Sequence, residues 1–116
     1  IEKKIVFSPH NYGKSVVPNI NIDQTSLYQD WDYNFGFMKN MGLTVVPGEW
    51  GGKTEIDSTW MNLFVNYCIQ KNIRDSFFWS LGPNSGDVAG LLYDDWTNID
   101  NFKLNIIKTL QPNPSN

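Results

Sequence analysis

The chain has 116 residues, of which 41% are hydrophobic and 15% aromatic, and its formal net charge is −3. This length fits one domain of ordinary size, and the hydrophobic content excludes an intrinsically disordered chain. The negative charge offers no electrostatic footprint for nucleic acid, and no apolar run approaches the roughly 20 residues of a membrane span. Because the sequence begins at Ile1 rather than Met and soon enters a strand-like segment, we expect a piece of a larger protein.

The first part of the sequence predicts a strand, a loop and a helix. The apolar run at 4–8 predicts the strand, and a polar loop rich in Asn, Pro and Gly follows from 9 to about 29. A helix is expected over 29–41, where apolar residues recur on one face before a glycine that favours a C-terminal stop. These residues are Trp31, Phe35, Met38 and Gly42.

The strand and helix pattern then occurs twice more. Residues 43–47 predict a second strand, and a helix is expected over 57–71, capped by Asp57 or Ser58. A third strand is expected over 75–81. A last helix is expected over 99–110, with Phe102, Ile106 and Leu110 on one face.

Strands that alternate with amphipathic helices imply an α/β fold with parallel strands and right-handed crossovers. We therefore expect residues 1–110 to form one structural unit. Residues 111–116 are rich in Pro, Asn and Ser, which predicts a tail or the start of a linker.

The cysteine and histidine content limits the chemistry of the chain. Cys68 is the only cysteine, so no disulfide forms within the chain, and a buried core thiol is the favoured interpretation over a nucleophile paired with His10. A zinc site needs more nitrogen and sulfur ligands than these. The adjacent pair Asp94 and Asp95 is interpreted as a solvated loop rather than a metal site, so no metal is predicted.

Polar and aromatic residues follow each predicted strand, where functional groups gather in parallel sheets. If the strands are neighbours, these side chains converge on one edge of the sheet. Each also has a structural interpretation: Glu49 as a solvated turn residue, His10 and Tyr12 as structural or loop-covering residues, and Trp79 as core. Trp50 is interpreted equally well as core or as a platform for a ligand.

Three ordered motifs resemble family 5 glycoside hydrolases, and within them endo-β-1,4-glucanases (cellulases). They are Ser-Pro-His-x-Tyr-Gly at 8–13, Gly-Glu-Trp-Gly-Gly at 48–52 and Phe-Trp-Ser-Leu-x-Pro-Asn-Ser-Gly-Asp at 78–87. The resemblance extends through 90–97 and the last helix, and so covers almost the whole chain. Two positions depart from the family pattern: Trp50 stands where Phe is usual, and Gly82 stands where Asn is common.

The resemblance implies that the chain forms the last three βα units, strands 6–8, of an eight-stranded (β/α)8 barrel, which is incomplete on its own. It also implies retaining hydrolysis of β-1,4-glucan by two glutamates, without a cofactor. Glu49 matches the nucleophile, Tyr12 the tyrosine that hydrogen-bonds it, and His10 a histidine at the −1 subsite. Trp79 matches the tryptophan under the −1 sugar. The predicted substrate-binding residues are Trp79, Trp50, Asn84 and Asp87.

The acid/base glutamate of the family, and its early substrate-binding Arg and His, have no match in this sequence. We therefore expect little activity from the chain alone, and association either with the missing N-terminal part of the enzyme or with itself. The expected location is extracellular. The alternative is a non-catalytic carbohydrate-binding or scaffold module derived from the same fold.

Overall fold

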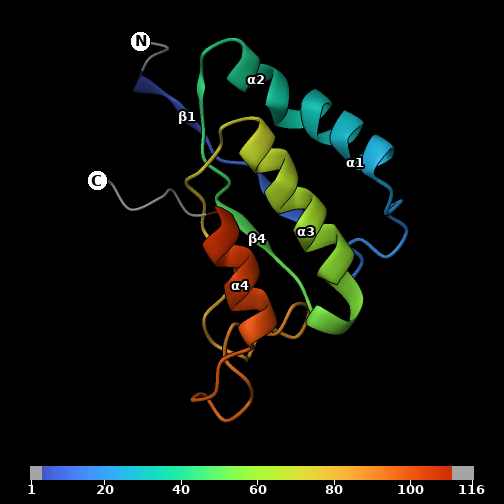
Figure 1. Ribbon diagram of the computed structural model, residues 1–116, viewed down its shortest axis with the longest axis vertical. Coiled ribbons are helices and arrows are strands. Elements are labelled where there is room, and N and C mark those ends of the chain that lie inside the picture. Colours follow the sequence, from blue (N-terminus) through green and yellow to red (C-terminus); the bar gives the residue numbers. More distant parts are fainter. Residues whose placement is uncertain (1–3, 111–116) are drawn as a thin grey trace.

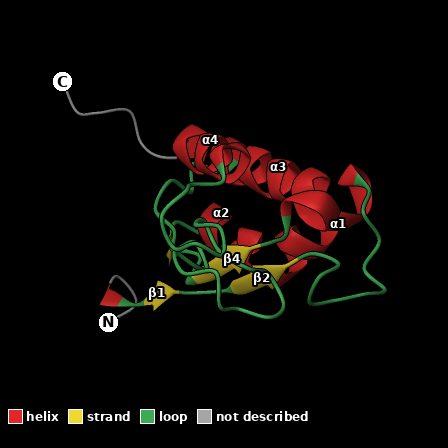
Figure 2. Ribbon diagram, turned by 90° about the horizontal axis from the view of Figure 1, so that it is seen from below, coloured by secondary structure: helices red, strands yellow, loops and turns green. Residues whose placement is uncertain are grey.

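The computed structural model describes residues 4–110, in which short parallel strands are covered on one face by helices (Figures 1 and 2). The elements are β1 (Val6–Phe7), β2 (His10–Tyr12), α1 (Gln24–Trp31), the π-helical turn η2 (Asp32–Gly36), α2 (Phe37–Asn40), β3 (Thr44–Val45), β4 (Glu49–Gly51), α3 (Thr54–Gln70) and α4 (Asn101–Leu110). The predicted tail, residues 111–116, lies outside the described residues.

The first two predicted strands correspond to β1 and β3, which are neighbours, and each is followed by a second short strand. β1 pairs with β3 and β2 with β4, both in parallel. Pro9 and Pro47 lack the N–H that a ladder needs, so regular pairing stops there. The connection persists because Gly48 N donates to the Pro9 carbonyl at 2.9 Å. The expected strand ends near 8 and 47 thus agree with β1 and β3, and the motif residues that follow them form two further short strands, β2 and β4.

The third predicted strand, 75–81, is reduced to one parallel bridge between Trp50 and Phe78. Backbone hydrogen bonds fix it beside β4: Phe77 N donates to the Pro47 carbonyl at 2.9 Å, and Trp79 N donates to the Trp50 carbonyl at 2.8 Å. The segment thus runs parallel to β4 as its second neighbour, after β2. This order brings the three predicted strand ends to one edge of the sheet.

The helix predicted over 29–41 begins earlier, at Gln24, and runs through α1, η2 and α2 to Asn40. Asp23 caps it, because its carboxylate accepts a hydrogen bond from Ser26 N at 2.8 Å. The early turn is mostly polar, which concealed its helical periodicity, although Leu27 lies buried one turn before Trp31.

The helix predicted over 57–71 also begins earlier, at Thr54. Asp57 is therefore not the N-cap residue but lies one turn into the helix. Its carboxylate reaches back to accept a hydrogen bond from Lys53 N at 2.9 Å, and Lys53 occupies the cap position.

The last helix begins at Asn101 rather than 99, after Asp100, whose carboxylate accepts a hydrogen bond from Phe102 N at 3.1 Å. Of the three residues expected on one face, Ile106 and Leu110 are buried, whereas Phe102 in the first turn is 41% exposed. Lys103 is buried there instead. Its ammonium donates to the carbonyl oxygens of Val88 and Gly90, at 3.1 and 3.0 Å.

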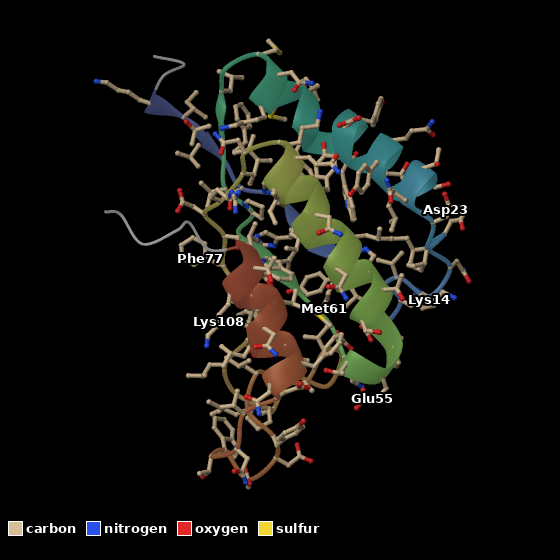
Figure 3. All side chains as sticks on the ribbon, viewed as in Figure 1. Lys14, Asp23, Glu55, Met61, Phe77 and Lys108 are labelled. Atoms are coloured by element: carbon tan, nitrogen blue, oxygen red, sulfur yellow. The ribbon has the colours of Figure 1, made fainter. Side chains whose placement is uncertain are left out.

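The hydrophobic core lies between the helices and the strands, and aromatic rings dominate it. Met61 lies near the centre of this layer and is fully buried (Figure 3). Cys68 is also fully buried, as predicted, and burial raises its thiol pKa to about 12. Within residues 4–110, no helix combines the length and the hydropathy required to cross a bilayer.

A candidate active-site cleft at the strand ends

The predicted nucleophile and its tyrosine partner are in direct contact. The hydroxyl of Tyr12 donates a hydrogen bond to Glu49 Oε1 at 2.7 Å. Burial raises the pKa of Tyr12 well above its usual range, and the hydrogen bond to Glu49 raises it further. Tyr12 therefore remains protonated throughout the physiological pH range, and its hydroxyl can donate to the Glu49 carboxylate.

The predicted histidine contacts the other oxygen of the same carboxylate. His10 Nδ1 lies 2.8 Å from Glu49 Oε2, and the side chains are 55% and 30% exposed. The two residues are register partners in the β2–β4 pair, and Tyr12 follows His10 by two positions on the same face. Parallel pairing thus places an imidazole and a phenol on the two oxygens of one carboxylate.

Two glycines provide the space for this arrangement. A Cβ on Gly48 would collide with Ser8 Oγ and lie 3.2 Å from His10 Nε2. A Cβ on Gly51 would collide with the carbonyl oxygen of Trp79. The glycines on either side of Glu49-Trp50 therefore admit the His10 ring and allow the third segment to approach β4.

A cleft of about 340 Å³ opens beside Glu49. It contains four of the predicted residues, with Trp79 46% exposed. The aromatic rings and carboxylates suit a sugar, which presents apolar C–H faces and hydroxyl groups. The residues that line the cleft are Tyr12, Val16, Glu49, Trp79, Ser85, Asp87 and Val88.

Two predicted substrate-binding residues lie elsewhere. Trp50 is fully buried, packs against Phe64 and Phe78, and donates from Nε1 to Ser76 Oγ at 3.0 Å. A substrate contact is therefore wrong for Trp50, because the residue after Glu49 points to the opposite face of the strand. Asn84 is exposed on the loop that carries Asp87, and it does not line the cleft.

Sequence reasoning missed three residues of the cleft. Ser85 and Val88 adjoin the predicted Asn84 and Asp87, so the motif at 78–87 could have indicated them. Val16 comes from the loop after β2, where no residue pattern indicates a site.

A second cavity, of about 610 Å³, lies between the first turns of α3 and α4 and the loop 89–95, and it contains none of the predicted site residues. In the part of the chain that the structure describes, no group of three or more His, Cys, Asp or Glu residues is placed to hold a metal ion.

The chain is similar to bacterial endoglucanases along most of its length. It is 36% identical over 116 residues to endoglucanase G of Acetivibrio thermocellus, covering 93% of this chain and 20% of that protein. It is 32% identical over 115 residues to the major extracellular endoglucanase of Xanthomonas campestris, covering 92% of this chain and 24% of that protein. The chain thus spans about a fifth to a quarter of the curated relatives it matches.

Solved structures give the same result. A cellulase–inhibitor complex matches with a TM-score of 0.88 and 37% identity, over 95% of this chain and 32% of that chain. An endocellulase of Pyrococcus horikoshii in complex with cellotetraose matches with a TM-score of 0.87 and 36% identity, over 95% of this chain and 32% of that chain. The model of the family described as cellulase (glycosyl hydrolase family 5) matches residues 1–85. The chain therefore forms part of the barrel of these enzymes and belongs to glycosyl hydrolase family 5, the cellulases.

Proposed function

We propose that the chain forms the sixth, seventh and eighth βα units of a retaining endo-β-1,4-glucanase and that Glu49 is its nucleophile. The observation that carries this proposal is the double contact of the Glu49 carboxylate, with the Tyr12 hydroxyl at 2.7 Å and with His10 Nδ1 at 2.8 Å. A carboxylate oriented by two partners beside an open cleft is equipped to attack a sugar carbon.

In the proposed reaction, one oxygen of Glu49 attacks the anomeric carbon and the bond to the leaving sugar oxygen breaks. An acid on the other side of the bond protonates that oxygen and later activates water, which releases Glu49 from the glycosyl-enzyme. Tyr12 orients the carboxylate for this attack and keeps its proton, because burial and the neighbouring Glu49 raise its pKa. His10 orients the second oxygen.

The proposed substrate is a β-1,4-glucan chain. Trp79, almost half exposed in the cleft, offers an apolar ring face to a glucose unit, and Asp87 offers a carboxylate to its hydroxyls. The complex of the similar Pyrococcus horikoshii endocellulase with cellotetraose supports an oligosaccharide ligand. An extracellular location is supported by the name of the Xanthomonas campestris relative.

A second glutamate, the acid/base, is proposed to come from a separate part of the enzyme. Glu55, the only other glutamate among residues 4–110, lines the second cavity rather than the cleft. General acid–base assistance is typically worth 10²–10⁴-fold, so we expect the 116-residue chain alone to hydrolyse cellulose very weakly. Its proposed partner is a polypeptide that carries the earlier βα units.

The experiment combines this chain with such a cellulase segment, either in one polypeptide or by mixing, and measures hydrolysis of carboxymethyl-cellulose. Glu49→Gln keeps the size of the side chain but removes the nucleophile, so we expect kcat to fall by about 10³-fold or more. Glu55→Gln, on the exposed surface of α3, is the matched control and is expected to leave kcat unchanged.

The alternative, a non-catalytic carbohydrate-binding module, predicts a different outcome. Binding of cello-oligosaccharides by the chain alone, unchanged by Glu49→Gln and with no hydrolysis in the combined protein, would favour that module. Hydrolysis that survives Glu49→Gln would show that the nucleophile has been assigned to the wrong residue.

A further inference from the structure

Asp57 is a buried carboxylate that the proposed reaction does not use. It lies on α3 and is only 1% exposed. Burial of a carboxylate is costly unless hydrogen bonds replace its water. Asp57 Oδ1 accepts from Ser15 N at 3.2 Å, and Oδ2 accepts from Lys53 N at 2.9 Å and from the Ser15 hydroxyl. The carboxylate therefore joins two segments that are distant in the sequence.

Those two segments are the continuations of the strands that carry the candidate catalytic side chains. Ser15 lies three residues after Tyr12, and Lys53 lies four residues after Glu49 and two residues beyond the end of β4. The strands themselves are in register, with Tyr12 opposite Gly51. Asp57 thus closes a ring of contacts that runs through β2, β4 and the first turn of α3.

The glycines of both segments show how closely the Asp57 side chain is enclosed. A Cβ on Gly13 would lie 2.7 Å from Asp57 Oδ1, and a Cβ on Gly52 would lie 2.5 Å from Asp57 Cβ. Gly13 directly follows Tyr12, and Gly52 directly follows β4. The side chain therefore lies against the backbone of both segments, and neither can shift without displacing it.

From these contacts we infer that Asp57 is a positioning residue, which fixes the Tyr12 hydroxyl against the Glu49 carboxylate by tying together the chain segments that follow them. The catalytic meaning of this inference rests on the proposed function. A displacement of about 1 Å at a reacting group can cost about 100-fold in rate, so a contact outside the cleft can control the reaction.

The test uses the combined enzyme and the variant Asp57→Asn, which keeps the shape of the side chain but turns one acceptor into a donor. We expect kcat for each folded molecule to fall about 10- to 100-fold, with KM changed by less than about twofold. In a Tyr12→Phe background, the same substitution is expected to lower kcat by less than about threefold, because the hydroxyl that Asp57 positions is already absent.

Asp100→Asn is the matched control. Asp100 is also a buried carboxylate at a helix start, and it accepts from Phe102 N, Lys103 N and the hydroxyl of Thr54, the first residue of α3. It has no hydrogen bond to the segment that follows β2, so it does not tie that segment to the one that follows β4. The variant Asp100→Asn is expected to lower the melting temperature about as much as Asp57→Asn does, but to leave kcat for each folded molecule unchanged.

The outcomes separate the two proposals. If Glu49→Gln abolishes activity but Asp57→Asn leaves kcat unchanged, the positioning role of Asp57 is overturned and the proposed nucleophile stands. If Asp57→Asn lowers kcat equally with and without Tyr12→Phe, the positioning role is overturned in the same way. Activity that persists in Glu49→Gln overturns the proposed nucleophile.

If Asp57→Asn does not fold, Ser15→Ala removes one of the same hydrogen bonds, and its effect on kcat must show the same dependence on the Tyr12 hydroxyl. Hydrogen exchange at the Ser15 amide must also quicken in Asp57→Asn, and unchanged protection contradicts the inference.

Discussion

At the scale of single residues, the candidate site depends on one carboxylate with a partner on each oxygen. The Tyr12 hydroxyl and His10 Nδ1 both lie within 2.8 Å of Glu49. Hydrogen bonds to charged groups contribute more than those between neutral groups, about 1.5–3 kcal/mol each. Because both partners come from β2, a single strand governs the orientation of the proposed nucleophile on β4.

Tyr12→Phe tests this dependence. The substitution removes the hydroxyl and leaves the ring in place, so we expect kcat/KM for the combined enzyme to fall about 10- to 100-fold. Steady-state kinetics on a soluble cello-oligosaccharide measures this change in kcat/KM. Tyr93→Phe, at an exposed tyrosine of the loop that follows residue 90, is the control and should match the unmodified enzyme. A change of less than twofold in Tyr12→Phe would remove Tyr12 from the proposed mechanism.

At the scale of elements, the helix at 24–40 packs on α3 through a polar contact as well as through apolar rings. The Tyr67 hydroxyl donates to Asp32 Oδ1 at 2.6 Å, and Lys71 Nζ lies 3.2 Å from the same oxygen. Burial, together with the bond to Asp32, raises the pKa of Tyr67 far above its usual range. Gly36 ends the π-helical turn directly beneath this hydroxyl.

Gly36→Ala is expected to break this packing. A Cβ there would collide with the Tyr67 hydroxyl and lie 2.9 Å from Asp32 Oδ1. Overpacking of this kind typically costs about 1–3 kcal/mol, so the unfolding midpoint in urea should fall. Gly86→Ala, where a Cβ meets nothing within 4 Å, is the control and should leave the midpoint unchanged. Equal unfolding midpoints in urea for the two variants would show that η2 accommodates the added methyl group without loss of stability.

At the scale of the whole molecule, the helices cover one face of the strands (Figure 2). Several large apolar side chains remain exposed. Val6 on β1 is 55% exposed and Phe77, at the edge of the molecule in Figure 3, is 67% exposed. Open strand edges and exposed apolar groups favour association. In the solved relatives, about two thirds of the chain lies beyond the part matched here.

We therefore expect the isolated chain to self-associate, and a segment with the earlier βα units to compete with that self-association. Light scattering during serial dilution is the measurement, and the scattering mass should fall towards that of a one-to-one complex when the segment is added. A sharp monomer at every concentration would contradict this expectation. The variant Phe77→Ser should weaken self-association, whereas Tyr33→Ser, at an exposed position of η2 in the helical layer, is its control.

Local periodicity in the sequence predicted the alternation of strands and helices, and parallel pairing predicted that Glu49, His10 and Tyr12 gather at one edge of the sheet if the strands are neighbours. The hydrogen bond from Tyr12 to Glu49 was expected only from the resemblance to family 5 glycoside hydrolases. The sequence does not show whether Trp50 points to the core or to the cleft. Pro9 and Pro47 interrupt the strands, and the residue at which the alternation of faces begins again is not evident from the sequence. The sequence also assigned Asp57 to a helix cap. The main partner of Asp57, Ser15, is 42 residues away, and no local pattern indicates such a contact.

The opposite directions of Glu49 and Trp50 also bear on how the substrate range of such an enzyme can change. One residue faces the cleft and the next anchors the helical layer, so an insertion or deletion in β4 would exchange the two and disrupt both. In the loop that carries Ser85 and Asp87, these two side chains lie outside the hydrophobic core, although Val88 is buried there. Laboratory evolution for new polysaccharides should therefore accumulate changes in that loop and leave β4 untouched.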